Sequence, residues 1–130
     1  MTERDALQYW LDSAEDNRKI AHDLFRLKHF AWSLYLGQLS LEKLLKGLLV
    51  SNGLEPLHSH DLAKLAKLAD IKLTTETISK LNEITTFNIE ARYDDYKLSF
   101  HLKATEQFAT KWLKVVEEFY RDFVEKIKND

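Results

Sequence analysis

Hydrophobic residues recur along most of this chain at the three- and four-residue spacing that places side chains on one face of an α-helix. The pattern predicts five helices, over about residues 5–28, 31–51, 59–69, 74–92 and 103–128. Leucines lie on more than one side of the second helix, which indicates a central position in the fold. We therefore expect an all-α protein, an up-and-down bundle of about five helices.

The hydrophobic face of each helix predicts which residues form the core. In the first helix the inward positions are Trp10, Ala14, Asn17, Ala21 and Leu24. In the last helix they are Phe108, Trp112, Val115, Phe119 and Phe123. The third helix is expected to turn inward Leu62, Leu65 and Leu68, or Ala66 and Ala69 as the alternative.

Two places along the chain predict breaks. Asn52 and Gly53 tolerate the left-handed conformation that ends many helices, and Pro56 follows shortly after them. Between residues 93 and 102, Asp94 and Asp95 favour a turn or a new helix cap, while apolar residues alternate as in an extended segment. We predict a break or an irregular loop there.

Composition narrows the class of protein. The 130 residues predict one domain over the whole chain, and three glycines and one proline leave few turns for a β-rich fold. Cysteine is absent, so disulfides and thiolate metal sites are excluded. A formal net charge of −2 gives no overall electrostatic attraction to nucleic acid. With neither a membrane span nor a signal peptide expected, the sequence predicts a cytoplasmic protein that needs no cofactor or metal.

Candidate chemistry is concentrated in the segment 88–96. Asn88, Arg92 and Asp95 are spaced to place an amide, a guanidinium and a carboxylate on one helical stripe. Such a stripe is either a site that recognises phosphate, base or substrate, or a structural arrangement in which Arg92 pairs with Asp95 or with Glu42.

A second stripe lies on the central helix, where Gln38, Glu42 and Lys46 are four residues apart and Lys43 stands beside them. These residues form either an ordinary helix-surface cluster or a strip facing phosphate. His60 follows His58 in a pair without a recognisable third metal ligand, so we expect no metal site. His60 is expected to fix the start of the third helix.

Together these residues resemble the HEPN (higher eukaryotes and prokaryotes nucleotide-binding) domain family. The similarity runs through nearly the whole chain in order, over four segments. The first segment contributes Trp10, Ala14, Ala21 and Leu24, and the second Gln38, Glu42, Lys43, Lys46, Gly47, Leu48 and Leu49. The third contributes Gly53, Pro56, His60, Asp61, Leu62 and Leu65, and the fourth Ala91, Arg92, Tyr93 and Asp95. The resemblance implies a helical bundle that forms homodimers. Such domains are often encoded beside a minimal nucleotidyltransferase, and many members are metal-independent RNases.

In the family's RNases an arginine and a histidine about four to six residues apart carry the cleavage, with histidine as general acid and base. This chain departs from that pattern, because eight residues separate Arg92 from His101. On one continuous helix the two side chains would face opposite sides. A break near Asp94, or a second subunit that supplies His101, would be needed to bring them together.

Three hypotheses follow. The first is a binding module, homodimeric and without catalysis, that contacts a nucleotide, RNA or a nucleotidyltransferase partner in a two-component, toxin-antitoxin-like system. Its ligand-binding residues would be Gln38, Glu42, Lys43, Lys46, Asn88, Arg92, Tyr93 and Asp95. The second is an endoribonuclease toxin that uses Arg92 and His101. The third is a structural homodimer without a ligand.

Overall fold

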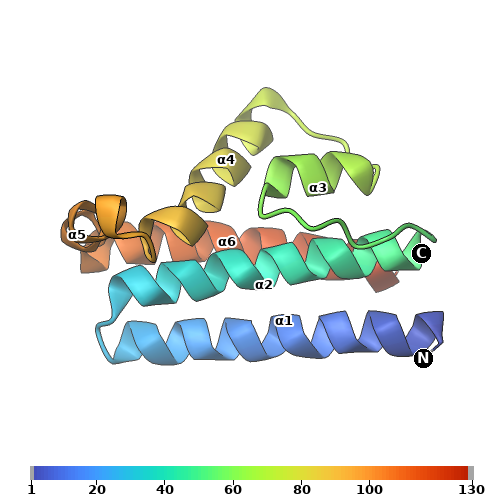
Figure 1. The fold of residues 1–130 in the computed structure, drawn as a ribbon, viewed down its shortest axis with the longest axis horizontal. Coiled ribbons are helices and arrows are strands. Elements are labelled where there is room, and N and C mark those ends of the chain that lie inside the picture. Colours follow the sequence, from blue (N-terminus) through green and yellow to red (C-terminus); the bar gives the residue numbers. More distant parts are fainter. Residues whose placement is uncertain (1, 129–130) are drawn as a thin grey trace.

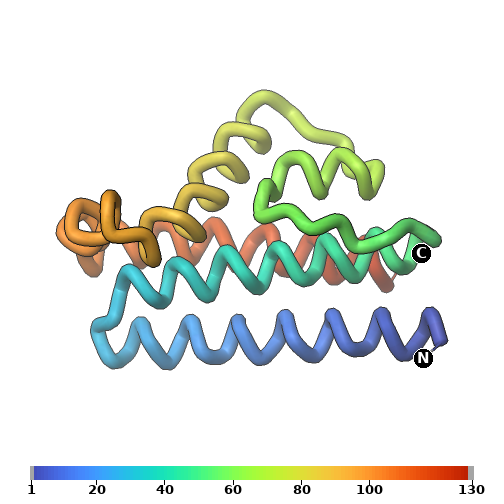
Figure 2. The backbone as a smooth tube through the Cα atoms, in the orientation of Figure 1, coloured from blue at the N-terminus to red at the C-terminus, as the bar shows by residue number. Residues whose placement is uncertain are grey.

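A computed structural model describes residues 2–128 of the chain. These residues form the helices α1 (Glu3–Arg26), α2 (Phe30–Ser51), α3 (Leu62–Leu68), α4 (Thr75–Glu90), α5 (Asp94–Lys103) and α6 (Glu106–Lys128). Figure 1 shows α1, α2 and α6 as three long rods, with α3 and α4 above α2 and α5 at one end; Figure 2 traces the same path as a tube. The all-α prediction is confirmed, with one helix more than the five expected. Within the described residues, no helix is long and apolar enough to cross a membrane.

The helix α2 is the centre of the bundle, and α1, α3, α4, α5 and α6 all contact it. Most of its leucines face these neighbours and are at most 2 % exposed, as at Leu34, Leu41 and Leu48, whereas Leu36 and Leu39 are only partly buried. Gly47 lets α1 lie close, because a Cβ at this position would lie 3.2 Å from the Cβ of Trp10. The leucines on several sides of this segment therefore reflect burial on several sides, as the sequence indicated.

Three helices end with the same backbone arrangement. The residue after the C-cap has a left-handed φ of 66° at Lys28, 78° at Gly53 and 63° at Asp70. After α1 this conformation directs the N–H of His29 to the carbonyl of Leu24, at 2.8 Å. The helix end predicted at Gly53 is confirmed. A side chain in this conformation costs about 1–2 kcal/mol, which glycine avoids and the other two positions do not.

The helices α3 and α4 begin at side-chain caps. Asp61 accepts a hydrogen bond from the backbone N–H of Lys64 at 3.1 Å, and Thr74 accepts one from Thr77 at 3.1 Å. The inner face of α3 combines the two alternatives, because Leu62 and Leu65 are buried together with Ala66 and Ala69, whereas Leu68 is 47 % exposed.

The prediction for the face of α6 is right at Phe123 and wrong by one position at the four residues before it. The buried residues are Ala109, Leu113, Val116, Tyr120, Phe123 and Ile127. The expected aromatic residues before Phe123 lie beside this seam and are partly buried. Small and aliphatic side chains let α6 approach α2, where a Cβ on Gly37 would lie 3.4 Å from Leu113. A prediction from hydrophobicity alone places the large aromatic residues inward. The contact between two helices instead favours, at the closest positions, side chains small enough to let the helices approach.

The segment after Arg92 also corrects an expectation. The chain does break there, because α4 ends at Glu90, but residues 94–103 form α5 instead of an irregular loop. Leu98 and Phe100 are two residues apart and would lie on the same face of an extended strand. In the helix they do not, because Phe100 is buried and Leu98 is 74 % exposed. Phe100 packs against Phe87 of α4 with ring centroids 5.5 Å apart. One buried ring thus anchors α5.

Charged side chains join α1 to α6. Arg18 Nε donates to Glu117 Oε1 at 2.9 Å, and His22 Nε2 lies 2.6 Å from the same oxygen. Burial would raise the pKa of Glu117, but the hydrogen bonds from His22 and Arg18 outweigh it and lower that pKa below its ordinary value. Beside them, Tyr120 donates to Glu15 at 2.8 Å, and burial together with that carboxylate raises the pKa of Tyr120.

The lowered pKa of Glu117 predicts a loss of stability in acid. A carboxyl group with a lower pKa in the folded state contributes stability above its unfolded pKa of about 4.3, and that contribution disappears as pH falls through the folded value. We expect Glu117→Gln to lower stability at pH 7 and to flatten the decline below about pH 4.5. Urea unfolding across that pH range measures both effects. Glu118→Gln, at the exposed neighbouring position, is the control, and equal pH profiles for the two variants would contradict the prediction.

Candidate functional site

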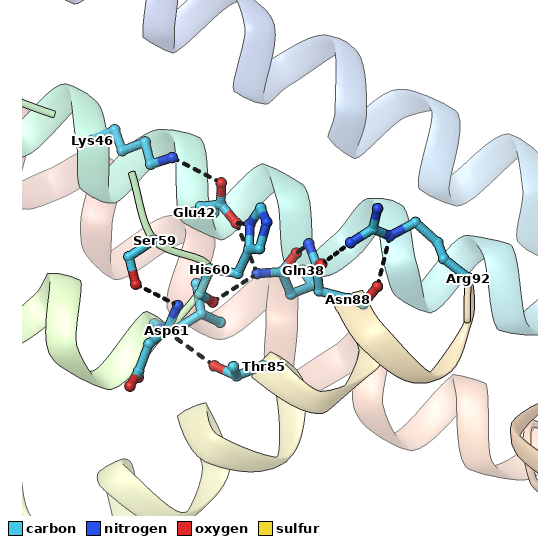
Figure 3. Close-up of polar contacts among 10 residues, drawn as sticks. Gln38, Glu42, Lys46, Ser59, His60, Asp61, Thr85, Asn88 and Arg92 are labelled. Carbon is cyan, nitrogen blue, oxygen red and sulfur yellow. Dashed lines mark hydrogen bonds and ion pairs between the residues drawn. The ribbon is translucent and has the colours of Figure 1, made fainter. Parts of the chain in front are cut away.

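A chain of buried amides joins α2 to α4 (Figure 3). Asn88 Nδ2 donates to Gln38 Oε1 at 2.8 Å, and both residues are fully buried. Gln38 Nε2 in turn donates to Glu42 Oε1 at 3.1 Å and to the backbone carbonyl of His60 at 3.2 Å. The two amide side chains therefore form their hydrogen bonds with other groups of the protein, as buried polar groups generally do.

Glu42 continues this chain as a buried carboxylate that is 4 % exposed. Its Oε2 accepts from Lys46 Nζ at 3.0 Å, and its Oε1 lies 2.8 Å from Nδ1 of His60. Lys46 also lies over the ring of Trp10, at 5.9 Å from the centroid. The ammonium of Lys46, the ring of His60 and the amide of Gln38 thus surround a charge that would be costly to bury alone. His60 reaches into this network, while the start of α3 is capped by Asp61.

Arg92 lies at the corner where α4 ends. Its Nε donates to the backbone carbonyl of Asn88 at 2.8 Å, and its Nη2 donates to Asn88 Oδ1 at 2.5 Å. The guanidinium also faces two rings, with its Cζ 5.4 Å from the centroid of Tyr35 and 5.1 Å from that of Tyr93. Among the described residues Arg92 forms no ion pair with Glu42 or Asp95, so the expected partners are corrected to Asn88 and two tyrosines.

A second cation and a histidine continue the row of rings. Trp32 packs edge-to-face on Tyr35 with centroids 6.0 Å apart and on the ring of His101 at 5.6 Å. Lys97 Nζ lies 5.5 Å from the centroid of Trp32. Arg92 and His101 therefore lie at the two ends of one row, with Tyr35 and Trp32 between them. The break before α5 makes this possible. On one continuous helix Arg92 and His101 would face opposite sides, whereas here His101 belongs to a separate helix.

The predicted site residues thus fall into two groups. Gln38, Glu42, Lys46, Asn88 and Arg92 form one connected network, most of it buried. Tyr93 and Asp95 are exposed at the α4–α5 corner.

Lys43 points elsewhere, because its Nζ donates to Ser13 of α1 at 2.6 Å. Burial against α1 lowers the pKa of Lys43, and the charge of nearby Glu42 only partly opposes this. Lys43 therefore does not share a groove with Arg92.

Sequence reasoning missed three members of the row. Tyr35, Trp32 and Lys97 were not among the residues that the sequence indicated for the site. Tyr35 and Trp32 lie far along the chain from Arg92 and Lys97, and these contacts depend on how α5 folds back beside the start of α2. The signal that could have found them is the spacing of Trp32 and Tyr35, which are three residues apart and share a helical face.

The buried amide pair predicts a large stability effect. Asn88→Ala leaves Gln38 Oε1 and Nη2 of Arg92 without their present partner, and an unsatisfied buried group costs about 1–3 kcal/mol. We expect the free energy of unfolding to fall by about 2–4 kcal/mol, measured by urea unfolding. Asn82→Ala is the matched control on an exposed position of the same helix, and it should change stability by less than about 0.5 kcal/mol. A similar small effect for both variants would show that the amide pair is not stabilising.

Comparisons with known proteins agree with this architecture. The chain is similar to the protein in the crystal structure of TT1696 from Thermus thermophilus, with a TM-score of 0.78 and 22% sequence identity over 92% of this chain and 97% of that one. This likeness shows a shared fold. A comparison with curated proteins gave no match. The sequence model of the HEPN domain matches residues 7–127, nearly the whole chain. The protein therefore belongs to the HEPN domain family.

Proposed function

We propose that this protein is a cytoplasmic HEPN module that binds a nucleotide or single-stranded RNA at the corner between α4 and α5. Membership in the family supports a nucleotide-binding or RNase-like module. The observation that carries the proposal is the row formed by Arg92, Tyr35, Trp32 and Lys97, together with the exposed ring of Tyr93. Its partner in this proposal is a minimal nucleotidyltransferase of a two-component, toxin-antitoxin-like system.

The chemistry of the row fits single-stranded nucleic acid. Bases stack on aromatic rings, while the phosphates between them are attracted by lysine and arginine. Tyr93 is 53 % exposed and offers a free surface beside the guanidinium of Arg92. Nη1 of that guanidinium has no hydrogen-bond partner in the described part of the chain, so it can still donate to a phosphate oxygen. Because the net charge is −2, binding should rest on this local patch and weaken with salt.

Binding is favoured over cleavage by the way the two candidate catalytic groups are held. Nε and Nη2 of Arg92 already donate hydrogen bonds to Asn88. The rings of Tyr35 and Trp32 separate Arg92 from His101. Nε2 of His101 is enclosed by the protein. General acid and base catalysis needs both groups within hydrogen-bond reach of one phosphate. Endoribonuclease activity through Arg92 and His101 is therefore the second candidate.

RNA binding tests the proposal directly. Tyr93→Ala removes an exposed stacking surface worth about 1–3 kcal/mol per base, so we expect the dissociation constant for a single-stranded oligoribonucleotide to rise about 5- to 150-fold. Arg92→Ala should weaken binding as well and reduce its salt dependence. Fluorescence anisotropy at two salt concentrations measures both.

The chain provides matched controls for this experiment. Tyr9→Ala and Arg121→Ala remove exposed residues of the same types elsewhere, and they should leave the affinity unchanged. Equal losses for Tyr93→Ala and Tyr9→Ala would contradict the proposed site. The same samples, analysed for RNA cleavage, decide between the two candidates. Cleavage by the wild type that disappears in both Arg92→Ala and His101→Ala would establish the endoribonuclease instead.

We also propose that the protein is a homodimer, with α5 of one copy antiparallel to α5 of the other. Leu98 and Leu102 are 74 % and 73 % exposed and lie four residues apart on one face of α5. Acidic residues occupy the first turn of α5, and basic residues, including Lys103, occupy its last turn. An antiparallel second copy would therefore cover both leucines and set opposite charges side by side.

Sedimentation velocity tests the homodimer. We expect the wild type to sediment as a dimer and Leu98→Glu or Leu102→Glu to sediment as a monomer, because each variant places a charge in the apolar centre of the contact. Ile20→Glu, on an exposed face of α1, is the control and should remain dimeric. A wild-type protein that stays monomeric at about 100 μM would refute the dimer, because the dissociation constant of a stable dimer lies below that concentration.

A further inference from the structure

A groove runs along one side of α6, facing the connection between α3 and α4. It consists of three adjoining cavities with volumes of about 750, 380 and 160 Å³. The first two share Ile71 and Lys126, and the last two share Thr77, Phe119 and Asp122. Figure 1 shows α2 and α6 ending on the same side of the molecule, and the groove opens there. From that end it continues along α6 to the first turns of α4.

The floor of the groove is apolar. Phe123 is 2 % exposed, and its ring stacks on that of Phe119 with centroids 5.7 Å apart. At the open end the buried Leu48 of α2 continues this floor, and Leu54 and Leu68 stand half-exposed at the edge. Buried rings below and exposed leucines at the edge suit apolar side chains of another molecule.

One wall of the groove carries a row of negative charge. Glu118, Asp122 and Glu125 line it from α6, and their spacing of four and three residues places them on one face of that helix. All three are exposed, and none forms an ion pair within residues 2–128. This wall therefore offers three unpaired carboxylates beside the apolar floor.

The other charges of the groove form no such row. Asp70 and Lys72 follow α3 with opposite signs, and Lys80 of α4 already pairs with Glu76 at 3.1 Å. Lys126 lies on α6 beyond the third carboxylate. An occupant of the groove should therefore present positive charge to α6 and apolar side chains to the floor. RNA does not meet this requirement, because its phosphates are repelled by the carboxylates.

The length and spacing of the groove fit an α-helix. Its lining residues on α6 run from Val115 to Lys126, a distance of about 17 Å or about three helical turns. A second helix laid along this stretch repeats its side chains every three or four residues, as the carboxylates do. Lysines or arginines at that spacing would each face one carboxylate, while leucines on the adjoining stripe would face the rings.

We propose that this groove binds a basic amphipathic α-helix of a partner protein. The apolar stripe of that helix packs on Phe119 and Phe123, and its cations pair with the three carboxylates of the α6 wall. The groove is separate from the proposed RNA site, because no residue of the row around Arg92 lines it. Binding of the helix is therefore independent of binding of RNA.

A synthetic peptide of about 18 residues tests the groove, since shorter helices are barely stable in water. Its sequence places leucines on one stripe and lysines, four and three residues apart, along the edge of that stripe. In fluorescence anisotropy we expect a dissociation constant of about 10 μM, and binding at least about tenfold weaker when glutamate replaces lysine. No binding of the lysine peptide at about 100 μM, or equal binding of both peptides, would overturn the proposal.

Paired variants show where the peptide binds. Glu118→Lys combined with Asp122→Lys should raise the dissociation constant about tenfold or more, because cations of the peptide then meet like charges. The control combines Asp12→Lys with Asp16→Lys, at exposed positions of α1 with the same spacing and the same change of net charge. It should alter the affinity by less than about twofold, because salt screens distant charges. An equal effect of both pairs would show attraction by net charge alone and would contradict the groove.

The apolar contact has its own test. Leu68→Ser removes an apolar side chain at the edge of the groove and should weaken binding about fivefold. Ile20→Ser, which removes a similarly exposed side chain from α1, should leave the affinity unchanged. Equal affinities of these two variants for the peptide would contradict the apolar contact.

Sedimentation velocity distinguishes a partner protein from a second copy of this chain. The combined variant Glu118→Lys with Asp122→Lys should keep the oligomeric state of the wild type, because a different protein fills the groove. A change in that state would show that a second copy occupies it, and would overturn the proposal.

Discussion

The hydrogen bond between the amides of Gln38 and Asn88 is the contact on which the arrangement of the helices around α2 depends. It lies where no water reaches, and its two side chains also hold Glu42, the carbonyl of His60 and the guanidinium of Arg92. Each of these groups would be costly to bury without its partner. The contact therefore fixes how α4 and the approach to α3 lie against α2, in a way that hydrophobic packing alone does not.

The position of Arg92 follows from this network. Asn88 holds the guanidinium at the end of α4, and the chain turns there into α5, which Phe100 anchors against Phe87. Because α5 folds back in this way, Lys97 and His101 reach the ring of Trp32 on α2. A surface with two cations and several rings thus forms on a protein whose overall charge is negative, and the same fold leaves apolar side chains of α5 exposed.

Much of the fold could be predicted from the sequence because it rests on local physics. Helix periodicity, the caps at Asp61 and Thr74 and the helix end at Gly53 depend on residues a few positions apart. The inner face of α6 could not be predicted as well, because the approach of α2 at Gly37 decides which side chains fit. The conformation of residues 94–103 was also predicted wrongly. Apolar residues at alternating positions around Leu98 favoured an extended segment, but the segment is a helix on which Leu98 is exposed.

The candidate site shows the same division. By itself the sequence determined that the chain forms helices, that Gln38, Glu42 and Lys46 share one stripe, and that Asn88 and Arg92 share another, because both stripes follow from the geometry of a single helix. Only the tertiary structure decided that most of these polar groups face inward and satisfy one another. It also decided that Arg92, Tyr35, Trp32 and His101 form one row, because that row joins side chains from separate helices whose packing no local pattern encodes.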